Sequence, residues 1–240
     1  MRRRGTRRVV VTAVALGSLV TVLGGCGGPD GRAHPDAPPS RRPVIEEPIG
    51  IPGVGDRWRR RIPADSRQVV AVYGDGRNSP DATVVLYSKS GTTWEPTRRW
   101  SAHNGKKGWT LDHREGDKRS PVGVFTLTDA GGVLPDPSSR LPYTRSAAMA
   151  APRWWPKSYW HDFDYVIAID YNRVKGAPPN DQRRPAGYSK GGGIWLHLDH
   201  GSGTSACVSL PKEAMAYLLR TLAPDRHPVV VMGDRADLRA

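Results

Sequence analysis

The chain has 240 residues, a length that suits one catalytic domain together with a targeting segment. Its formal net charge of +13 favours an anionic membrane, wall polymer or nucleic acid as partner, but no nucleic-acid-binding motif is present, so we expect no nucleic acid. Cys26 and Cys207 are the two cysteines of the sequence, which excludes a disulfide framework apart from one possible bridge between them.

Residues 1–25 have the pattern of an export signal. Five arginines lie within residues 1–8, an uncharged and mostly apolar run of 14 residues covers 9–22, and the letters LGGC follow. A basic start, a short apolar segment and small residues are typical of a signal peptide, and the run is short for a transmembrane helix, which needs about 20 residues. The LGGC sequence resembles the lipobox of bacterial lipoproteins. This resemblance implies that Cys26 is acylated and anchors the exported protein to the outer face of the cytoplasmic membrane, next to the cell wall.

Residues 26–63 are predicted to form a tether. Eight prolines, six glycines and several arginines occur between residues 27 and 63, and no apolar periodicity is present. Such a composition favours an extended, unpacked chain. We therefore expect a catalytic domain over residues 64–240, held away from the membrane.

The rest of the chain is rich in candidate strands. Short runs of β-branched, aromatic and aliphatic residues alternate with turn-forming residues, at 69–73, 82–87, 94–100, 124–127, 165–169, 194–198 and 229–232. The third run is interrupted at Pro96. This spacing predicts a mainly β sandwich or barrel.

Helical signals are concentrated near the C-terminus. The segment from Ser209 and Pro211 to Leu222 carries one apolar stripe at helical spacing, and Pro224 ends it. Residues 149–160, rich in tryptophan and proline, predict an irregular or short helical insertion, and 171–188 predict a polar loop. The fold class expected is therefore mainly β, with one or two packed helices.

The candidate site lies in residues 191–210, which read GGGIWLHLDHGSGTSACVSL. His197 ends a predicted strand, and Cys207 follows ten residues later, after a loop of glycine, serine, aspartate and threonine. An ordinary thiol is only about 3% thiolate at pH 7, and a neighbouring histidine raises that fraction. A loop that folds back would thus create a Cys–His site for acyl transfer. The alternative is that both side chains are core residues.

The surroundings of Cys207 favour the functional interpretation. Glycine and serine let the backbone approach a ligand closely. Because the predicted helix begins just after Cys207, its N-terminal N–H groups and dipole would stabilise a thiolate and an oxyanion there.

Three segments resemble the L,D-transpeptidase (YkuD-like) family. Residues 114–125, REGDKRSPVGVF, are similar to its Gly-Asp-x-x-[ST]-Pro-x-Gly-x-Phe motif, and the LPY of 141–143 and the IWLH…TSACVSL of 194–210 occur in the same order. The resemblance covers about residues 69–233. It implies a YkuD-like β sandwich or barrel that acts on peptidoglycan stem peptides without a cofactor. Family members release the terminal D-amino acid and pass the acyl group to an amine or to water.

The resemblance also implies roles for individual residues. Cys207 matches the nucleophile and His197 the base, and the turn of Thr204, Ser205 and Ala206 would direct the N–H groups of Ala206 and Cys207 at the oxyanion. Candidate substrate contacts are His200, Ser209 and Trp195.

Two positions depart from the family pattern. Ala206 stands where glycine is usual, so either the turn is built without a positive φ or the oxyanion donors are displaced. Ser209 stands where many members carry arginine, which leaves recognition of a substrate carboxylate unassigned.

Other functions remain open at the level of sequence. His197, His200 and Cys207 could supply three ligands to a catalytic zinc ion, although no HExxH or paired CxxC motif is present and no metal is expected. A non-catalytic lipoprotein that binds peptidoglycan is the second alternative. We expect a monomer in either case.

Overall fold

The structure is a computed structural model that describes residues 50–240, which belong to one compact unit. The predicted signal peptide, the acylation site at Cys26 and the first part of the predicted tether lie outside the described residues. Within residues 50–240, no helix has the length and apolar character needed to cross a membrane.

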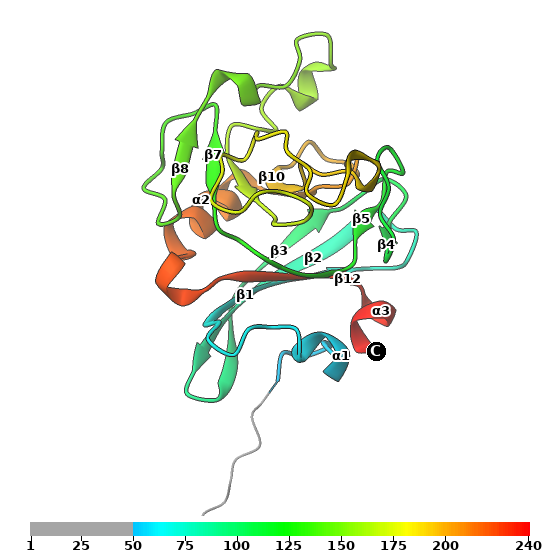
Figure 1. Ribbon diagram of the computed structural model, residues 1–240, viewed down its shortest axis with the longest axis vertical. Helices are drawn as coiled ribbons and strands as arrows, with labels where there is room; N and C mark the ends of the chain where they lie inside the picture. The colour runs from blue at the N-terminus through cyan, green and yellow to red at the C-terminus, as the bar shows by residue number, and fades with distance from the viewer. Residues whose placement is uncertain (1–49) are drawn as a thin grey trace, which may run out of the picture. The chain divides into compact units, whose positions relative to one another are not determined.

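The described chain forms mostly strands, with a few short helices (Figure 1). The strands are β1 (Gln68–Gly74), β2 (Asp81–Ser90), β3 (Thr93–His103), β4 (Trp109–Thr110), β5 (Ser120–Pro121), β6 (Gly123–Thr126), β7 (Ala130–Gly132), β8 (Tyr143–Arg145), β9 (Val166–Ala168), β10 (Trp195–Leu198), β11 (Val208–Leu210) and β12 (Val229–Asp234). The α-helices are α1 (Asp56–Arg59), α2 (Lys212–Thr221) and α3 (Arg235–Arg239). Single 3-10 turns cover Ala147–Met149, Lys157–Tyr159, Tyr188–Lys190 and Pro224–Arg226.

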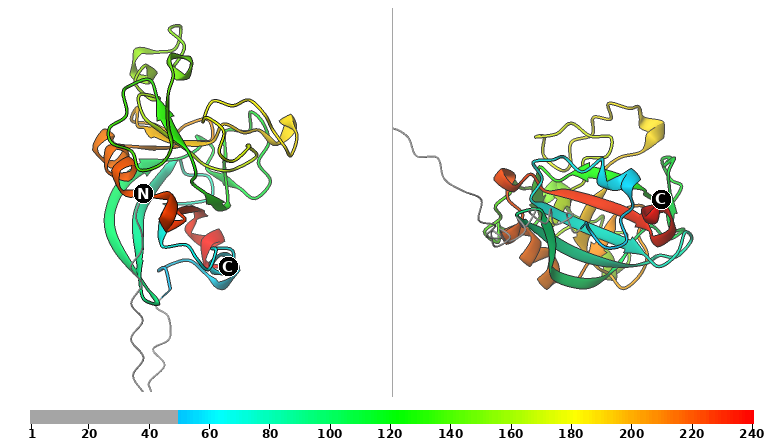
Figure 2. Two further views of the ribbon diagram at one scale, coloured as in Figure 1. Left: turned by 60° about the vertical axis from the view of Figure 1, so that its left-hand side comes forward. Right: turned by 90° about the horizontal axis from the view of Figure 1, so that it is seen from below.

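One mixed sheet runs in the order β6-β12-β1-β2-β3-β11-β10-β9-β7-β8, and β4 and β5 form a separate parallel pair. The half that contains β1, β2, β3 and β12 meets the half that contains β10 and β9 through one registered pair, Ser209 with His103. Figure 1 shows the first half below the second, and Figure 2 shows the long loops gathered above the sheet. This arrangement confirms the mainly β fold predicted from the sequence.

The predicted strands form because their apolar residues are buried. All seven residues of β1 are buried, since it pairs in parallel with β12 on one side and antiparallel with β2 on the other. The interruption predicted at Pro96 takes the form of a bulge within β3. The register shifts between Leu86 and Tyr87, and the hydroxyl of Thr97 donates to the Leu86 carbonyl at 3.0 Å, so the strand continues through a bulge.

The helix α2 begins later than predicted. Residues Val208–Leu210 form the buried strand β11, in parallel register with β10, and the helix starts at Lys212. Extended pairing with β10 buries Val208 and Leu210, and this packing outweighs the local helical pattern. As a result Cys207 precedes a strand, and the expectation that a helix N-terminus stabilises its thiolate is wrong.

The predicted boundary of the tether at residue 63 also requires correction. Ile51, Val54 and Trp58 are buried in the core, and the indole N–H of Trp58 donates to the Asp237 carbonyl at 2.6 Å. Figure 1 shows α1 beside α3 at the C-terminal end of the chain. Isolated apolar residues among prolines and glycines carry no periodic signal, but tertiary contacts bury them, and residues 50–63 are therefore part of the folded domain.

We expect Trp58→Ala to destabilise the domain by roughly 3–5 kcal/mol, because it removes a fully buried indole and leaves a cavity. Denaturant-induced unfolding would measure this change. Arg60→Ala, in the same segment but with an 82% exposed side chain, is the control and should change stability by less than about 0.5 kcal/mol. Equal, small effects of both substitutions would show that residues 50–63 do not stabilise the domain.

Candidate active site

The parallel pairing of β10 with β11 places His197 and Cys207 on one face of the sheet. Leu196 is registered with Val208 and His197 with Ser209, so Cys207, which directly precedes β11, lies opposite Trp195. Side chains alternate across a strand, and Trp195 and His197 therefore share the face on which Cys207 lies. The loop after His197 thus folds back as the sequence predicts.

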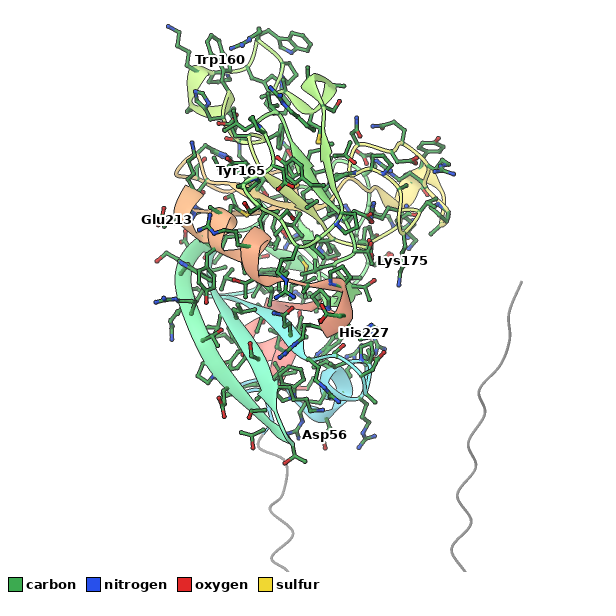
Figure 3. The ribbon with its side chains drawn as sticks, turned by 90° about the vertical axis from the view of Figure 1, so that its left-hand side faces the viewer. Asp56, Trp160, Tyr165, Lys175, Glu213 and His227 are labelled. Carbon is green, nitrogen blue, oxygen red and sulfur yellow. The ribbon has the colours of Figure 1, made fainter. Side chains whose placement is uncertain are left out.

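His197 and Cys207 line one cavity of about 340 Å³. Both segments predicted as irregular contribute walls: Trp155 and Tyr159 come from the insertion after β8, and Pro179 and Arg184 come from the loop before β10. Trp154 is 85% exposed and does not line the cavity. Figure 3 shows Trp160 at the tip of the protruding insertion, and it does not line the cavity either. Of the insertion's tryptophans, Trp154, Trp155 and Trp160, only Trp155 lines the cavity.

The thiol of Cys207 is held by backbone groups. The N–H of Trp195 lies 3.4 Å from its Sγ, and the thiol lies 3.6 Å from the Gly193 carbonyl. The residue is partly exposed in the cavity, whereas the packing around the sulfur raises the pKa of Cys207 to about 11. The resting group is therefore a neutral thiol at pH 7.

His197 is neutral as well. Burial lowers the pKa of His197 to about 4, and its Nδ1 lies 2.7 Å from the Leu198 carbonyl. This contact assigns the proton to Nδ1 and leaves Nε2 as the acceptor. The expectation that a neighbouring histidine raises the thiolate fraction is thus not met in the resting site. A neutral imidazole retains the capacity to take the thiol proton as the sulfur attacks.

The turn before Cys207 is built without a positive φ at Ser205 or Ala206, so alanine is accommodated in place of glycine. Two carbonyls of this turn accept hydrogen bonds. The Thr204 hydroxyl donates to the Cys207 carbonyl and the Ser120 hydroxyl to the Ala206 carbonyl, each at 2.6 Å. In the part of the chain that the structure describes, the N–H groups of Ser205, Ala206 and Cys207 donate to no protein acceptor. Such free donors are what an oxyanion requires.

Ser120 contacts the turn before Cys207, and the sequence interpretation did not single it out. It belongs to the GDKRSP segment, where Asp117 accepts from the N–H groups of Arg114 and Arg119 and closes a turn. The turn directs the buried Ser120 hydroxyl to the Ala206 carbonyl, while the Gly105 N–H donates to the same hydroxyl at 2.9 Å. The serine or threonine position of the family motif was the sequence signal that could have pointed to Ser120.

His200, a predicted substrate contact, lies in the wall of the cavity and is bound to Asp162. Its Nδ1 is 2.9 Å from Oδ2 of Asp162, and both side chains are 3% exposed. Burial lowers the pKa of His200, and burial together with the Asp199 carboxylate raises the pKa of Asp162 to about 7. The His200 ring stacks parallel to His197, with centroids 6.4 Å apart.

The structure places the other two predicted substrate contacts, Trp195 and Ser209, in different surroundings. Trp195 lines the cavity, and its indole N–H donates to the Pro179 carbonyl at 3.2 Å. Ser209 is completely buried, and its hydroxyl donates to Asp199 at 2.6 Å. Because Ser209 does not line the cavity and its hydroxyl is bound to Asp199, the structure does not support the prediction that Ser209 contacts substrate.

The zinc alternative lacks a ligand cluster. Within residues 50–240, no three histidine, cysteine or acidic side chains are arranged to hold a metal ion.

A second cavity, of about 190 Å³, also reaches the nucleophile candidate. It is lined by His113, Glu115 and Lys118 on one side and by the Ser205–Cys207 turn on the other. The two cavities share Gly193, Ser205 and Cys207, so space for a ligand extends away from the thiol in two directions.

The chain is a mainly β domain in which a cysteine and a histidine line one cavity. Residues 77–231 match YkuD, the L,D-transpeptidase catalytic domain, and the chain belongs to this family.

Two solved structures resemble the fold. The helical cell shape determining protein Pgp2 from Campylobacter jejuni is 18% identical, with a TM-score of 0.42, and the match covers 74% of this chain and 51% of that chain. Bd1075 from Bdellovibrio bacteriovorus is 16% identical, with a TM-score of 0.39, and the match covers 70% and 48% of the two chains. This chain thus spans about half the length of each. No curated protein matches the sequence.

We expect iodoacetamide to alkylate Cys207 slowly at neutral pH, because a pKa of about 11 leaves only about one thiol in 10⁴ ionised at pH 7. The rate should rise about tenfold per pH unit up to roughly pH 10. Peptide mass analysis of a Cys26→Ser background would follow Cys207 alone. His197→Gln should leave the rate nearly unchanged. A fast rate that is constant above pH 6, and that His197→Gln lowers, would instead reveal a thiolate–imidazolium pair.

Proposed function

We propose that this protein is a cell-wall L,D-transpeptidase in which Cys207 is the nucleophile and His197 the base. The observation that carries the proposal is the shared cavity, which the Cys207 thiol and the neutral His197 imidazole both line, while the turn that carries Cys207 has unpaired N–H groups. The family match supports peptidoglycan as the substrate. The proposed donor is a stem tetrapeptide, which is cleaved before its terminal D-amino acid.

The first half-reaction forms a thioester. The Cys207 sulfur attacks the scissile carbonyl carbon while its proton moves to Nε2 of His197. The N–H groups of Ala206 and Cys207 donate to the oxyanion of the tetrahedral intermediate, an interaction in which one donor typically contributes about 3–4 kcal/mol of barrier lowering. The C–N bond then breaks, and the leaving amine takes the proton from His197.

The second half-reaction reverses these steps with a new nucleophile. His197 takes a proton from an amine of a neighbouring stem or from water, and that group attacks the thioester and releases the Cys207 thiol. Amine attack forms a crosslink, and water attack gives a shortened stem. The two cavities that meet at Cys207 support binding of groups on both sides of the thioester.

We also propose that the protein is exported and anchored through acylated Cys26. Removal of residues 1–25 with their five arginines would lower the net charge from +13 to +8, which fits contact with anionic envelope polymers. A non-catalytic wall-binding protein is the alternative, which would bind stems without turning them over.

Purified enzyme should convert a disaccharide-tetrapeptide into a crosslinked dimer or a tripeptide, with release of the D-amino acid, as read by mass spectrometry. We expect Cys207→Ala to lower turnover by at least roughly 10³-fold, because no other thiol of residues 50–240 could form the thioester, and His197→Ala by about 10²–10⁴-fold. His161→Ala, which alters a largely exposed histidine, should retain activity. Undiminished turnover in Cys207→Ala would contradict the mechanism, and binding without turnover by the unaltered protein would favour the alternative.

In the native host, Cys26→Ser should move the protein from the membrane fraction to the soluble extracellular or periplasmic fraction, because a single acylated cysteine would be the anchor. Immunoblots of the fractions would measure the change. Retention of the serine variant in the membrane would contradict acylation at Cys26.

A further inference from the structure

We propose that the Arg184 guanidinium forms a carboxylate-binding subsite beside Cys207, and that it binds the carboxylate next to the amine that leaves or enters the thioester. The inference rests on the proposed function and adds a determinant of substrate choice to it. Ser209 occupies the position where many family members carry arginine, and it is buried against Asp199. The cation proposed here comes from a different loop.

Arg184 is held directly against the backbone that contacts the nucleophile. A Cβ atom added to Gly192 would lie 2.1 Å from Nε of Arg184 and 2.8 Å from Cζ, and one added to Gly193 would lie 3.4 Å from Nη2. The side chain therefore packs across these two glycines, whose positive φ angles of 158° and 63° also favour glycine. The Gly193 carbonyl in turn lies 3.6 Å from the Cys207 sulfur.

The position of Arg184 is fixed at one end and its charge is uncompensated. Its Nη1 donates to the backbone carbonyls of Asp181 and Arg183, at 2.9 and 3.0 Å. In the described part of the chain no carboxylate lies within ion-pair distance of Arg184, because the Asp181 carboxylate pairs with Arg183 at 2.8 Å. Arg184 nevertheless lines the cavity and is only partly exposed.

The remaining charges of the cavity also favour an anion. Lys106 lines the wall near His200, and its Nζ lies 3.4 Å from the Tyr159 hydroxyl. Asp162 is the acidic residue among the lining side chains, and it is buried against His200. An anionic ligand group would therefore meet two cations and no exposed carboxylate.

The chemistry identifies which carboxylate fits. The leaving amine must receive a proton from His197, so it lies in the cavity that His197 and Arg184 both line. By microscopic reversibility, an incoming amine occupies the same place. A terminal D-amino acid carries its carboxylate one carbon from that amine, and a guanidinium binds a carboxylate through two parallel hydrogen bonds. Arg184 would thus select donors with a free terminal carboxylate and acceptors with a carboxylate beside the amine.

The test measures binding to the Cys207→Ala protein, which cannot form a thioester. Calorimetry would compare a stem tetrapeptide ending in D-alanine with the same peptide as its C-terminal amide. We expect the acid to bind about 10- to 100-fold more tightly than the amide. Adding Arg184→Gln should abolish this preference, and Arg184→Lys should leave part of it. The neighbouring Arg183→Gln, which alters an exposed side chain outside the cavity, should retain the full preference, and thermal melts would verify that all variants are folded.

Each outcome separates the inference from the proposed function. Equal binding of acid and amide, no binding of either, or an undiminished preference in a folded Arg184→Gln protein would overturn the subsite. If the acid preference depends on Arg184 but the protein with Cys207 intact releases no D-alanine, the subsite is supported and the proposed catalytic function is wrong.

Discussion

The parallel register between β10 and β11 is the constraint on which the candidate site depends. It sets Cys207 opposite Trp195 and two positions from His197 along the same face. Both strands are buried at nearly every position, so a slip by one residue would move apolar side chains out of the core and turn the imidazole or the thiol away from the cavity. The core packing that stabilises the sheet therefore also fixes the geometry of the site. The Ser120 hydroxyl extends this constraint to the turn before Cys207 by binding the Ala206 carbonyl.

Burial gives the cysteine and the histidine opposite pKa shifts. The charged form of each group is disfavoured, so the thiol keeps its proton and the imidazole remains without a second one. A site of this kind holds no reactive thiolate while it is empty, and proton transfer would accompany attack on a bound carbonyl. The cost of forming charge in the cavity would be offset by the N–H groups of the turn and by the cations that line the wall.

Two long irregular segments complete the walls of the cavity, to which the sheet contributes Trp195 and His197 of β10. The insertion after β8 contributes Trp155 and Tyr159, and the loop before β10 contributes Arg184 and contacts Trp195 through the Pro179 carbonyl. Loops carry ligand contacts in many proteins because a rigid scaffold positions them while their own sequence is free to vary. Here the same arrangement lets Arg184 lie beside Cys207, although the two residues come from different segments and Ser209 is buried away from the cavity.

The amino-acid sequence by itself determined the family, the mainly β fold class, the single longer helix near the C-terminus, and the choice of His197 and Cys207 as candidate residues, which the structure places in the lining of one cavity. These features depend on local periodicity and on motif order, which are readable without coordinates.

Tertiary structure decided the rest. Val208–Leu210 became a strand because β10 lies beside it, and Trp58 joined the core because α3 offers a carbonyl and apolar contacts. The partners of His200 and Arg184 could not be read from the sequence either, since Asp162 lies 38 residues from His200 along the chain and the backbone under Arg184 belongs to another turn. Burial and long-range contacts depend on the whole fold, and for that reason the charge state and the ligand preference of the site emerge only when the chain is folded.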